Sequence, residues 1–288
     1  MRYLALVNPL SNGGRAGRRW REFAHLLPDA KFIELKSVDE GRELARTATD
    51  CETVVACGGD GTINAIADGV MANPDTSLKF GVIYQGTSPD FCTFHGIPTE
   101  PSDACKLLQD GTVRNIPVLQ ANGRCFFCSC NLGMGATVAS RANRLRPFIG
   151  DKFGTLLALL SALLASPGYD ITVSGAPISH CGHLLVTRMP YIASGLKVSL
   201  PPLADDEFAA WSVKDMSLFR WLKLLPKLYK GEPCGEVQVC RSNCRISSSK
   251  TVDVEYDGDP HGSLPLEISF APRRLKLVAP LQKEATHA

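Results

Sequence analysis

The stretch VVACGGDGTINAIADGV, residues 54–70, joins an apolar run to a helix-like run through a loop that holds three glycines and one carboxylate. The pattern predicts a buried strand that passes directly into a helix. Gly58, Gly59 and Gly61 let the backbone turn tightly and approach a ligand closely. The free N–H groups at the helix start would face the same place, which suits phosphate. Asp60 would repel phosphate, so we expect Mg²⁺ or an ordered water between them.

The composition excludes few classes of protein. The chain has 288 residues, and 31 Lys and Arg stand against 29 Asp and Glu, which gives a net charge of +2 and no global argument for nucleic-acid binding. A hydrophobic fraction of 44% is ordinary for a globular protein. The start, MRYLALVNPL, has too few apolar residues for a secretory signal or a membrane span, so a cytoplasmic protein is expected.

The eleven cysteines raise the question of a metal site. The run CFFCSC, residues 125–130, is apolar and aromatic and is typical of a strand, with Cys128 and Cys130 on one face. Zinc sites favour paired C-x2-C knuckles on turns. We therefore expect reduced, buried thiols rather than a zinc site or a disulfide framework.

The first third of the chain alternates strand-like and helix-like runs. This alternation builds right-handed βαβ units around a parallel sheet. The predicted strands are 3–8, 31–35, 53–57 and 79–84, and the predicted helices lie near 16–27, 39–49 and 62–71, with two short helices up to about Gln109.

Beyond about residue 112, short alternating runs predict a mostly antiparallel sandwich, interrupted by helical stretches at 151–165 and 217–230. The expected fold class is α/β plus mainly-β, with an N-terminal Rossmann-like parallel sheet domain and a C-terminal β-sandwich domain. We place the first domain at 1–112 and the second at 113–272, with 273–288 as a candidate to pack back on the first.

Two further loops follow predicted strands in the same way as the GGDGT loop. NPLSNGG, residues 8–14, follows the first strand, and GTSPDF, residues 86–91, follows the fourth. The carboxyl ends of parallel strands meet at one edge of a sheet, so the three loops support a single anion site. The purely structural alternatives are a tight turn capped by Asp60 and Thr62, and a helix cap formed by Asp90.

NPLSNGG, GGDGTIN and GTSPDF…GIP stand in the order and approximate spacing of the diacylglycerol kinase catalytic domain, which bacterial lipid kinases and sphingosine kinases share, and the chain resembles that family. The C-terminal YDGDPHGSLPLEISF is similar to the family's DGE tripeptide and its following strand. GGDGT alone also occurs in NAD kinases and phosphofructokinases, whereas the four-part order is specific. The resemblance covers nearly the whole chain.

The resemblance implies phosphoryl transfer from ATP to a lipid alcohol, with ATP and Mg²⁺ as cofactors. It implies Asp259 as the carboxylate that accepts the hydroxyl proton, with Asp257 as its supporting neighbour. A cleft between the two domains is the expected place for such a site. The implied nucleotide-binding residues are Asn8, Gly58, Gly59, Asp60, Gly61, Thr62, Thr87 and Asp90.

Bacterial members of the family hold a structural metal with one carboxylate and two backbone carbonyls in a segment like L-x-x-D-x-L. By this resemblance LADDEF, residues 203–208, implies a metal held by Leu203, Asp206 and Phe208, with Asp205 as an adjacent candidate. The family's usual glycine after the aspartate is Glu207 here. The alternative is a solvated acidic turn.

Three departures from the family pattern indicate a divergent subgroup. Ser88 and Pro89 precede Asp90 where the family has asparagine, Ala65 stands in place of a glutamate, and Asp259 is one methylene shorter than the family's glutamate. These departures keep open a nucleotide-binding module without catalysis. An NAD kinase stays open as a further alternative, because such enzymes share GGDGT and a β-rich second domain. The sequence does not identify the acceptor lipid.

SLFRWLKLLPKLYKGE, residues 217–232, predicts an amphipathic helix. Its basic residues suggest peripheral contact with an anionic membrane that holds the lipid substrate. The alternative is an ordinary helix packed on the second domain. The run 154–165 is too short to span a bilayer. Whether the chain forms a homodimer is left open. The basic residues are Arg220, Lys223, Lys227 and Lys230, and the apolar residues expected on the other face are Leu218, Trp221, Leu222, Leu225 and Leu228.

Overall fold

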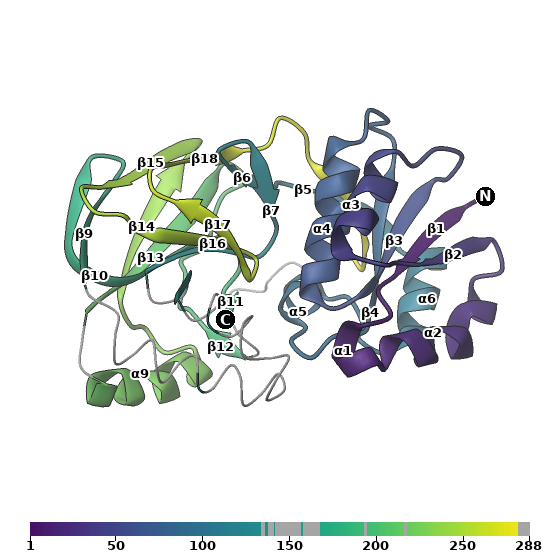
Figure 1. Cartoon of the computed structure of the whole chain (residues 1–288), viewed down its shortest axis with the longest axis horizontal. Helices are drawn as coiled ribbons and strands as arrows, with labels where there is room; N and C mark the ends of the chain where they lie inside the picture. Colours follow the sequence, from purple (N-terminus) through teal and green to yellow (C-terminus); the bar gives the residue numbers. More distant parts are fainter. Residues whose placement is uncertain are drawn as a thin grey trace. The chain divides into compact units, whose positions relative to one another are not determined.

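The computed structural model describes residues 1–133, 136–137, 141, 157, 168–192, 195–215 and 218–281. The chain divides into two compact units (Figure 1). The first comprises Met1–Val118 and Ala271–Ala288, and the second comprises Leu119–Phe270. The helix predicted at 151–165 lies outside the described residues except for Leu157.

The first unit contains a mixed sheet with the strand order β2-β1-β3-β4-β19-β5. All of its neighbouring strands are parallel except β5, which pairs antiparallel with β19. Because β19 returns from the C-terminal part of the chain and holds β5, the first unit extends past residue 112 to Val118. The strands are β1 (Tyr3–Val7), β2 (Ala30–Glu34), β3 (Thr53–Gly58), β4 (Lys79–Tyr84), β5 (Thr112–Ile116) and β19 (Leu275–Ala279).

Helices cover this sheet, and every residue of β1 and β3 is buried, as expected for central parallel strands with both faces covered. α4 is buried along most of its length, including Ile63, Ile66 and Val70 at helical spacing. The helices are α1 (Ser11–Gly14), α2 (Ala16–Phe23), the 3₁₀ helix η1 (Ala24–Leu26), α3 (Val38–Arg46), α4 (Asp60–Ala72), α5 (Asp90–His95) and α6 (Pro101–Asp110).

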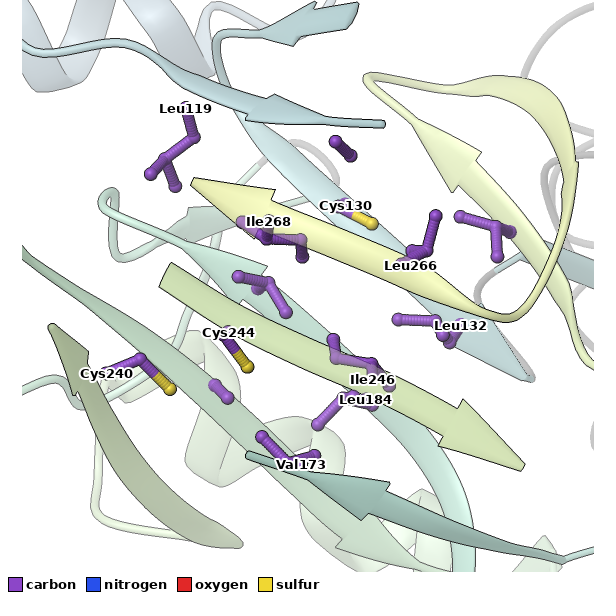
Figure 2. Packing of buried hydrophobic residues seen from close by; sticks show 14 of the residues in the cluster. Leu119, Cys130, Leu132, Val173, Leu184, Cys240, Cys244, Ile246, Leu266 and Ile268 are labelled. Carbon is purple, nitrogen blue, oxygen red and sulfur yellow. The ribbon is translucent and has the colours of Figure 1, made fainter. Parts of the chain in front are cut away.

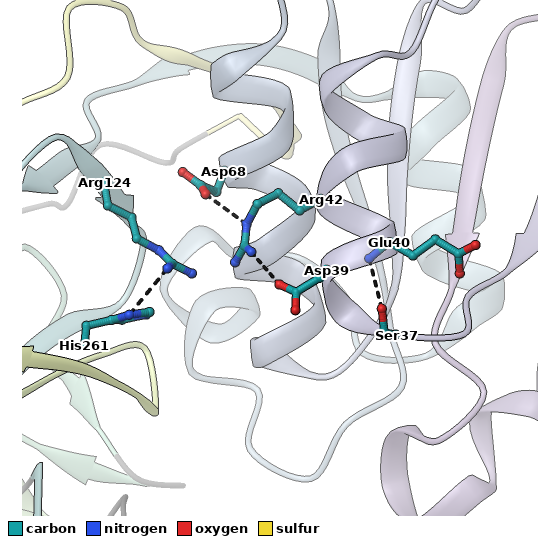
Figure 3. Close-up of polar contacts among 7 residues, drawn as sticks. All are labelled: Ser37, Asp39, Glu40, Arg42, Asp68, Arg124 and His261. Atoms are coloured by element: carbon teal, nitrogen blue, oxygen red, sulfur yellow. Dashed lines mark hydrogen bonds and ion pairs between the residues drawn. The ribbon is translucent and has the colours of Figure 1, made fainter.

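An arginine ties α3 to α4. The Arg42 guanidinium lies 2.6 Å from the Asp39 carboxylate on its own helix and 3.1 Å from that of Asp68 on α4 (Figure 3). Gly69 of α4 lies so close to Arg42 that a Cβ there would overlap the α3 backbone. The Ser37 Oγ accepts a hydrogen bond from the Glu40 N–H and caps the start of α3. These contacts fix α4, whose first turn carries Asp60.

The second unit is built on antiparallel strand pairs, in the order β17-β16-β8-β10-β9-β15-β18-β6-β7, with β13 pairing with β10 and β14. This arrangement and the first sheet confirm the predicted fold class. α9 (Leu218–Lys230) confirms the helix predicted at 217–230. The strands are β6 (Leu119–Ala121), β7 (Arg124–Phe126), β8 (Ser129–Gly133), β9 (Tyr169–Val173), β10 (Ala176–Thr187), β11 (Tyr191–Ile192), β12 (Leu196–Lys197), β13 (Glu207–Lys214), β14 (Glu236–Arg241), β15 (Asn243–Ser248), β16 (Asp253–Tyr256), β17 (Asp259–Ser263) and β18 (Leu266–Phe270).

Two hydrophobic clusters stabilise the second unit. The larger lies among its strands and includes Cys130, Leu132, Leu184 and Ile268 (Figure 2). The smaller contains Trp211 and lies against α9. All eleven cysteines of the chain are reduced thiols, and most of them are buried. Burial raises the pKa of Cys130, which keeps its thiol protonated at neutral pH.

Candidate functional site

Two loops at the carboxyl edge of the first sheet are hydrogen-bonded to each other. Asn8, directly after β1, donates from Nδ2 to the Oγ1 of Thr62 in α4 at 2.8 Å. The Gly59 N–H points at the Oγ of Ser11 at 3.4 Å. The NPLSNGG and GGDGT loops therefore form one structural element although they lie about fifty residues apart.

Glycines allow the loops after β3 and β4 to touch through their backbones. A Cβ on Gly59 would lie 3.2 Å from the Gly86 Cα, and a Cβ on Gly86 would lie 2.6 Å from the Gly59 Cα. A Cβ on Gly58 would lie 2.6 Å from the side chain of Thr62. These three glycines serve the close packing of the loops. A Cβ on Gly61, in contrast, would meet nothing within 4 Å, so the space beside it is open.

The first turn of α4 has the features of an anion site. Its N-cap is Gly59, which has no side chain to cap the helix. The Gly59 carbonyl accepts the N–H groups of Thr62 and Ile63 at 2.9 and 3.0 Å, so the earlier N–H groups of the helix face outward. Asp60 is the acidic residue of this turn and is half-buried. The helix start can therefore receive a phosphate group beside a carboxylate.

The pKa of Tyr84, the last residue of β4, is affected by the charged groups around this site. Burial raises the pKa of its hydroxyl, the negative charge of Asp60 raises it further, and Asp90 adds a smaller contribution. The pKa of Cys92 is raised by burial and then by Asp60. Asp60 and Asp90 therefore lie at the same edge of the sheet, both within electrostatic reach of Tyr84.

Asp90 begins α5, and its Oδ2 accepts a hydrogen bond from the Ser88 Oγ at 3.1 Å. This contact also suits the alternative role of Asp90 in shaping the helix start. Thr87 is exposed in the same loop. The structure thus places all the residues predicted to bind nucleotide at the carboxyl ends of β1, β3 and β4.

In the second unit, the predicted catalytic carboxylates lie on the hairpin of β16 and β17. Asp257 and Gly258 form its two-residue turn, with φ values of 52° and 93°, as hairpins of the Asp-Gly type require. The Asp257 carboxylate accepts backbone N–H groups of Phe127, Cys128 and Ser129 at 2.8, 2.8 and 2.9 Å. Burial raises its pKa to about 6 although these three hydrogen bonds lower it. Asp257 therefore holds the hairpin against the turn between β7 and β8.

Asp259 lies across the turn from Tyr256 and is exposed. Its side chain is accessible to a substrate, whereas that of Asp257 is engaged by backbone groups. The hairpin is further ordered by His261, whose ring lies 4.8 Å from that of Tyr256. A guanidinium nitrogen of Arg124 lies 3.4 Å from the Nδ1 of His261 (Figure 3).

Glu255 is a third carboxylate of this hairpin, and the sequence motifs did not indicate it. It is 4% exposed, it accepts a hydrogen bond from the Gly258 N–H, and it pairs across the strands with Asn131 of β8. Burial raises its pKa to about 8, and the charges of Asp257 and Asp259 contribute to this shift. The available signal was an acidic residue between Val254 and Tyr256 of an apolar strand, two positions before Asp257.

The LADDEF loop already contains a cation of the protein itself. The Arg188 guanidinium donates to the carbonyl oxygens of Ala204 at 3.0 Å, Asp205 at 3.3 Å and Glu207. The Glu207 carboxylate accepts the Ala204 N–H at 2.9 Å and pairs with Arg241 at 2.7 Å. The glutamate that replaces the family's glycine is thus part of an arginine-linked turn.

The residues implied as metal ligands lie in a loop that already holds the Arg188 guanidinium, whose positive charge would oppose a metal ion bound there. The Asp206 carbonyl accepts the Ser242 N–H at 3.1 Å, and three neighbouring carbonyls face Arg188. Over the described residues, no three His, Cys, Asp or Glu side chains gather in a way that could hold a metal. Of the four implied ligands, Phe208 is buried, Leu203 is half-buried, and Asp205 and Asp206 are exposed.

Comparison with known proteins gives two family matches. The Diacylglycerol kinase catalytic domain matches residues 2–121, and the YegS C-terminal NAD kinase beta sandwich-like domain matches residues 128–279. A "Probable lipid kinase YegS-like" of Pseudomonas aeruginosa is 35% identical over 247 residues, which covers 79% of this chain and 76% of that protein. A "Diacylglycerol kinase" of Bacillus subtilis is 27% identical over 249 residues, 81% of this chain and 79% of that one.

A solved structure shares the fold. "A putative diacylglycerol kinase from Bacillus anthracis str. Sterne" aligns with a TM-score of 0.75 over 96% of each chain, at 18% sequence identity. At this level of identity the likeness concerns the architecture.

Proposed function

Because the chain belongs to the diacylglycerol kinase catalytic domain family, we propose that it is a lipid kinase that transfers the terminal phosphate of ATP to a lipid hydroxyl. The observation that carries the proposal is the glycine-capped start of α4 between the touching loops of Gly59 and Gly86. The names of the relatives from Bacillus subtilis and Pseudomonas aeruginosa support a lipid as the acceptor.

The nucleotide would bind at the carboxyl edge of the first sheet. The backbone N–H groups at the start of α4 would hold phosphate oxygens, because Gly61 leaves the adjacent space open. Asn8 would keep Thr62 oriented, and Thr87 and Asp90 would contact the nucleotide from the neighbouring loop. Asp60 would bind Mg²⁺ together with the phosphates, and the bound ion would neutralise charge on the transferred group.

In the proposed step the oxygen of the lipid hydroxyl bonds to the terminal phosphorus while the bond from that phosphorus to the bridging oxygen breaks and ADP leaves. Asp259 accepts the hydroxyl proton. Asp257 and Glu255 act as positioning residues, since one holds the hairpin through three backbone N–H groups and the other holds Gly258. Asp259 is exposed, as a group that meets a bulky substrate must be.

We further propose that the enzyme is cytoplasmic and reaches its acceptor by peripheral contact with a membrane, in phospholipid biosynthesis. None of the described helices combines the length and the apolar character needed to cross a bilayer. The acceptor lipid within this class is to be found by experiment.

The test is transfer of label from γ-labelled ATP to a panel of lipids in vesicles. We expect Asp259→Asn to lower turnover by ~10²–10⁴ while Mg-ATP binding persists, and Asp259→Glu to retain activity. Asp253→Asn is the matched control, because Asp253 is an exposed aspartate at the start of β16. Wild-type protein that binds ATP and labels no lipid would support the binding module instead, and label on NAD would support an NAD kinase.

A further inference from the structure

Helix α9 belongs to the second unit (Figure 1), and one of its faces packs against that unit. Trp221 and Leu228 are 6% and 3% exposed and, with Leu224, they contact the cluster around Trp211. Positions 221, 224 and 228 follow the spacing of one helix face. This face explains how α9 is held.

A second face of α9 exposes large apolar side chains to solvent. Phe219, Leu222 and Tyr229 are 77%, 46% and 62% exposed, and Pro226 on the same stripe is exposed as well. The sequence pattern placed Leu222 with Trp221 on one apolar face. That prediction was wrong, because consecutive residues diverge by about 100° and only Trp221 points to the core.

A third face is basic. Arg220, Lys223, Lys227 and Lys230 are all exposed, and each follows a residue of the apolar stripe by one position. The basic stripe therefore lies about 100° around the helix from the apolar stripe, and both stripes border the side that faces away from the core. Lys230 lies 3.7 Å from Glu232, and both side chains remain largely in solvent.

The exposed apolar surface continues on β14. Val237 and Val239 are 37% and 41% exposed and pair with Trp211 and Ala209 of β13. Cross-strand partners share a face, so both valines lie on the face that carries Trp211 and α9. Among the described residues, five of ten exposed large hydrophobic side chains belong to α9 and β14. Such a concentration marks an interaction surface.

We propose that this surface is a docking site for an anionic lipid bilayer, with Phe219, Leu222 and Tyr229 inserted at the headgroup boundary and the basic stripe on anionic headgroups. An apolar stripe beside a lysine-rich stripe is the pattern of helices that lie in the membrane interface. A second copy of the chain would oppose the same positive charges. The inference rests on the proposed lipid kinase function for its biological purpose, but the binding itself does not depend on catalysis.

The test uses the full chain and sedimentation with vesicles of phosphatidylcholine, with or without phosphatidylglycerol. We expect wild-type protein to bind the anionic vesicles at low salt. Lys223→Glu/Lys227→Glu should weaken binding by at least about 25-fold, since each basic residue contributes about fivefold. Phe219→Ser/Leu222→Ser should weaken binding in a way that low salt does not restore.

Matched control variants distinguish a loss of vesicle binding caused by α9 from a general effect of changed charge or lost apolar surface. Lys31→Glu/Lys250→Glu makes the same charge change at two exposed lysines elsewhere, and Val113→Ser removes another exposed apolar side chain, so both variants should bind as wild type. Unchanged thermal unfolding of the α9 variants shows that their fold is intact.

Three results would overturn the proposal: wild-type protein that ignores anionic vesicles at low salt, α9 variants that bind as wild type, or a wild-type dimer that Phe219→Ser/Leu222→Ser dissociates. A kinase assay distinguishes this inference from the proposed function. With a dispersed short-chain lipid the α9 variants should equal wild type, and only vesicle-borne substrate should reveal their defect. Vesicle binding without phosphorylation of any lipid would contradict the proposed kinase function and leave the proposed docking surface intact.

Discussion

Gly59 and Gly86 approach each other so closely that a Cβ on Gly59 would lie 3.2 Å from the Cα of Gly86. The two residues follow neighbouring parallel strands, β3 and β4, and their contact sets the spacing of the two loops at the start of α4. No side chain larger than hydrogen fits between them. The shape of the proposed phosphate site therefore depends on backbone packing. We expect a substitution to lower stability at a glycine that packs against the other loop, and to weaken ligand binding at a glycine that borders open space.

Gly86→Ala should lower stability by about 1–3 kcal/mol, because the new Cβ would lie 2.5 Å from the Tyr84 hydroxyl oxygen and 2.6 Å from the Gly59 Cα. Gly61→Ala is the matched variant in the same loops. Its Cβ meets nothing, so stability should be retained, but the methyl group would enter the space proposed for phosphate and weaken Mg-ATP binding. Denaturation with and without Mg-ATP measures both effects. Equal unfolding curves for the two variants would contradict this division of roles.

Asp60→Asn should largely remove the rise in melting temperature that Mg-ATP produces in the wild-type protein, because ligand stabilisation follows occupancy of the site. Without ligand the melting temperature should change little, since asparagine keeps the size of the side chain and removes a modest favourable interaction with the helix dipole. The measurement is a thermal shift over a range of Mg-ATP concentrations, with ATP in EDTA as the reference. An undiminished shift in the variant would mean that Asp60 only shapes the turn.

Glu255→Gln should change how stability depends on pH. The folded state raises the pKa of Glu255 to about 8 from its ordinary value of 4.5, so folding favours the protonated carboxyl. The contribution of this group to wild-type stability is therefore greatest below the unfolded pKa and is lost as pH rises toward 8, by roughly 1.4 kcal/mol per unit of pH at most. The amide introduced by Glu255→Gln does not titrate. The free energy of unfolding of the variant should therefore rise relative to that of the wild-type protein as the pH increases across this window.

Chemical denaturation at several pH values measures this difference. Asp257, with its pKa near 6, shifts stability in the same direction, but it is present in both proteins and its effect cancels to first order. Glu267→Gln is the control, because Glu267 is exposed on β18. Parallel stability curves for wild type and Glu255→Gln would show that the buried carboxyl does not titrate as proposed.

Arg188→Ala should destabilise the second unit by about 1–3 kcal/mol, because three carbonyl groups of the LADDEF loop lose their donor and the guanidinium also lies 5.4 Å from the Phe270 ring centroid. Arg245→Ala removes only an exposed ion pair of 3.8 Å with Glu267 and should cost little. If Arg188 supplies the cation of this loop, EDTA will leave the wild-type melting temperature unchanged. A fall in EDTA that Asp206→Asn reproduces would restore the metal site implied by the family.

Local patterns determined much of the architecture. The alternating strands and helices of the first third were predictable because buried parallel strands read as apolar runs and the helices between them as amphipathic ones. The three loops were predictable as neighbours because parallel strands end at a common edge. The hydrogen bond from Asn8 to Thr62 shows that two of these loops are in contact.

Tertiary structure alone decided the features that depend on contacts between distant segments. Periodicity does not encode strand partners, so it could not show that β19 lies between β4 and β5. It could not show that the Asp257 carboxylate holds backbone N–H groups of residues 127–129, or that Glu255 lies buried behind it. Sequence patterns also could not show that Leu222 is exposed or that Arg188 donates hydrogen bonds to carbonyl groups of the LADDEF loop. Both features depend on which surfaces of the folded chain are in contact.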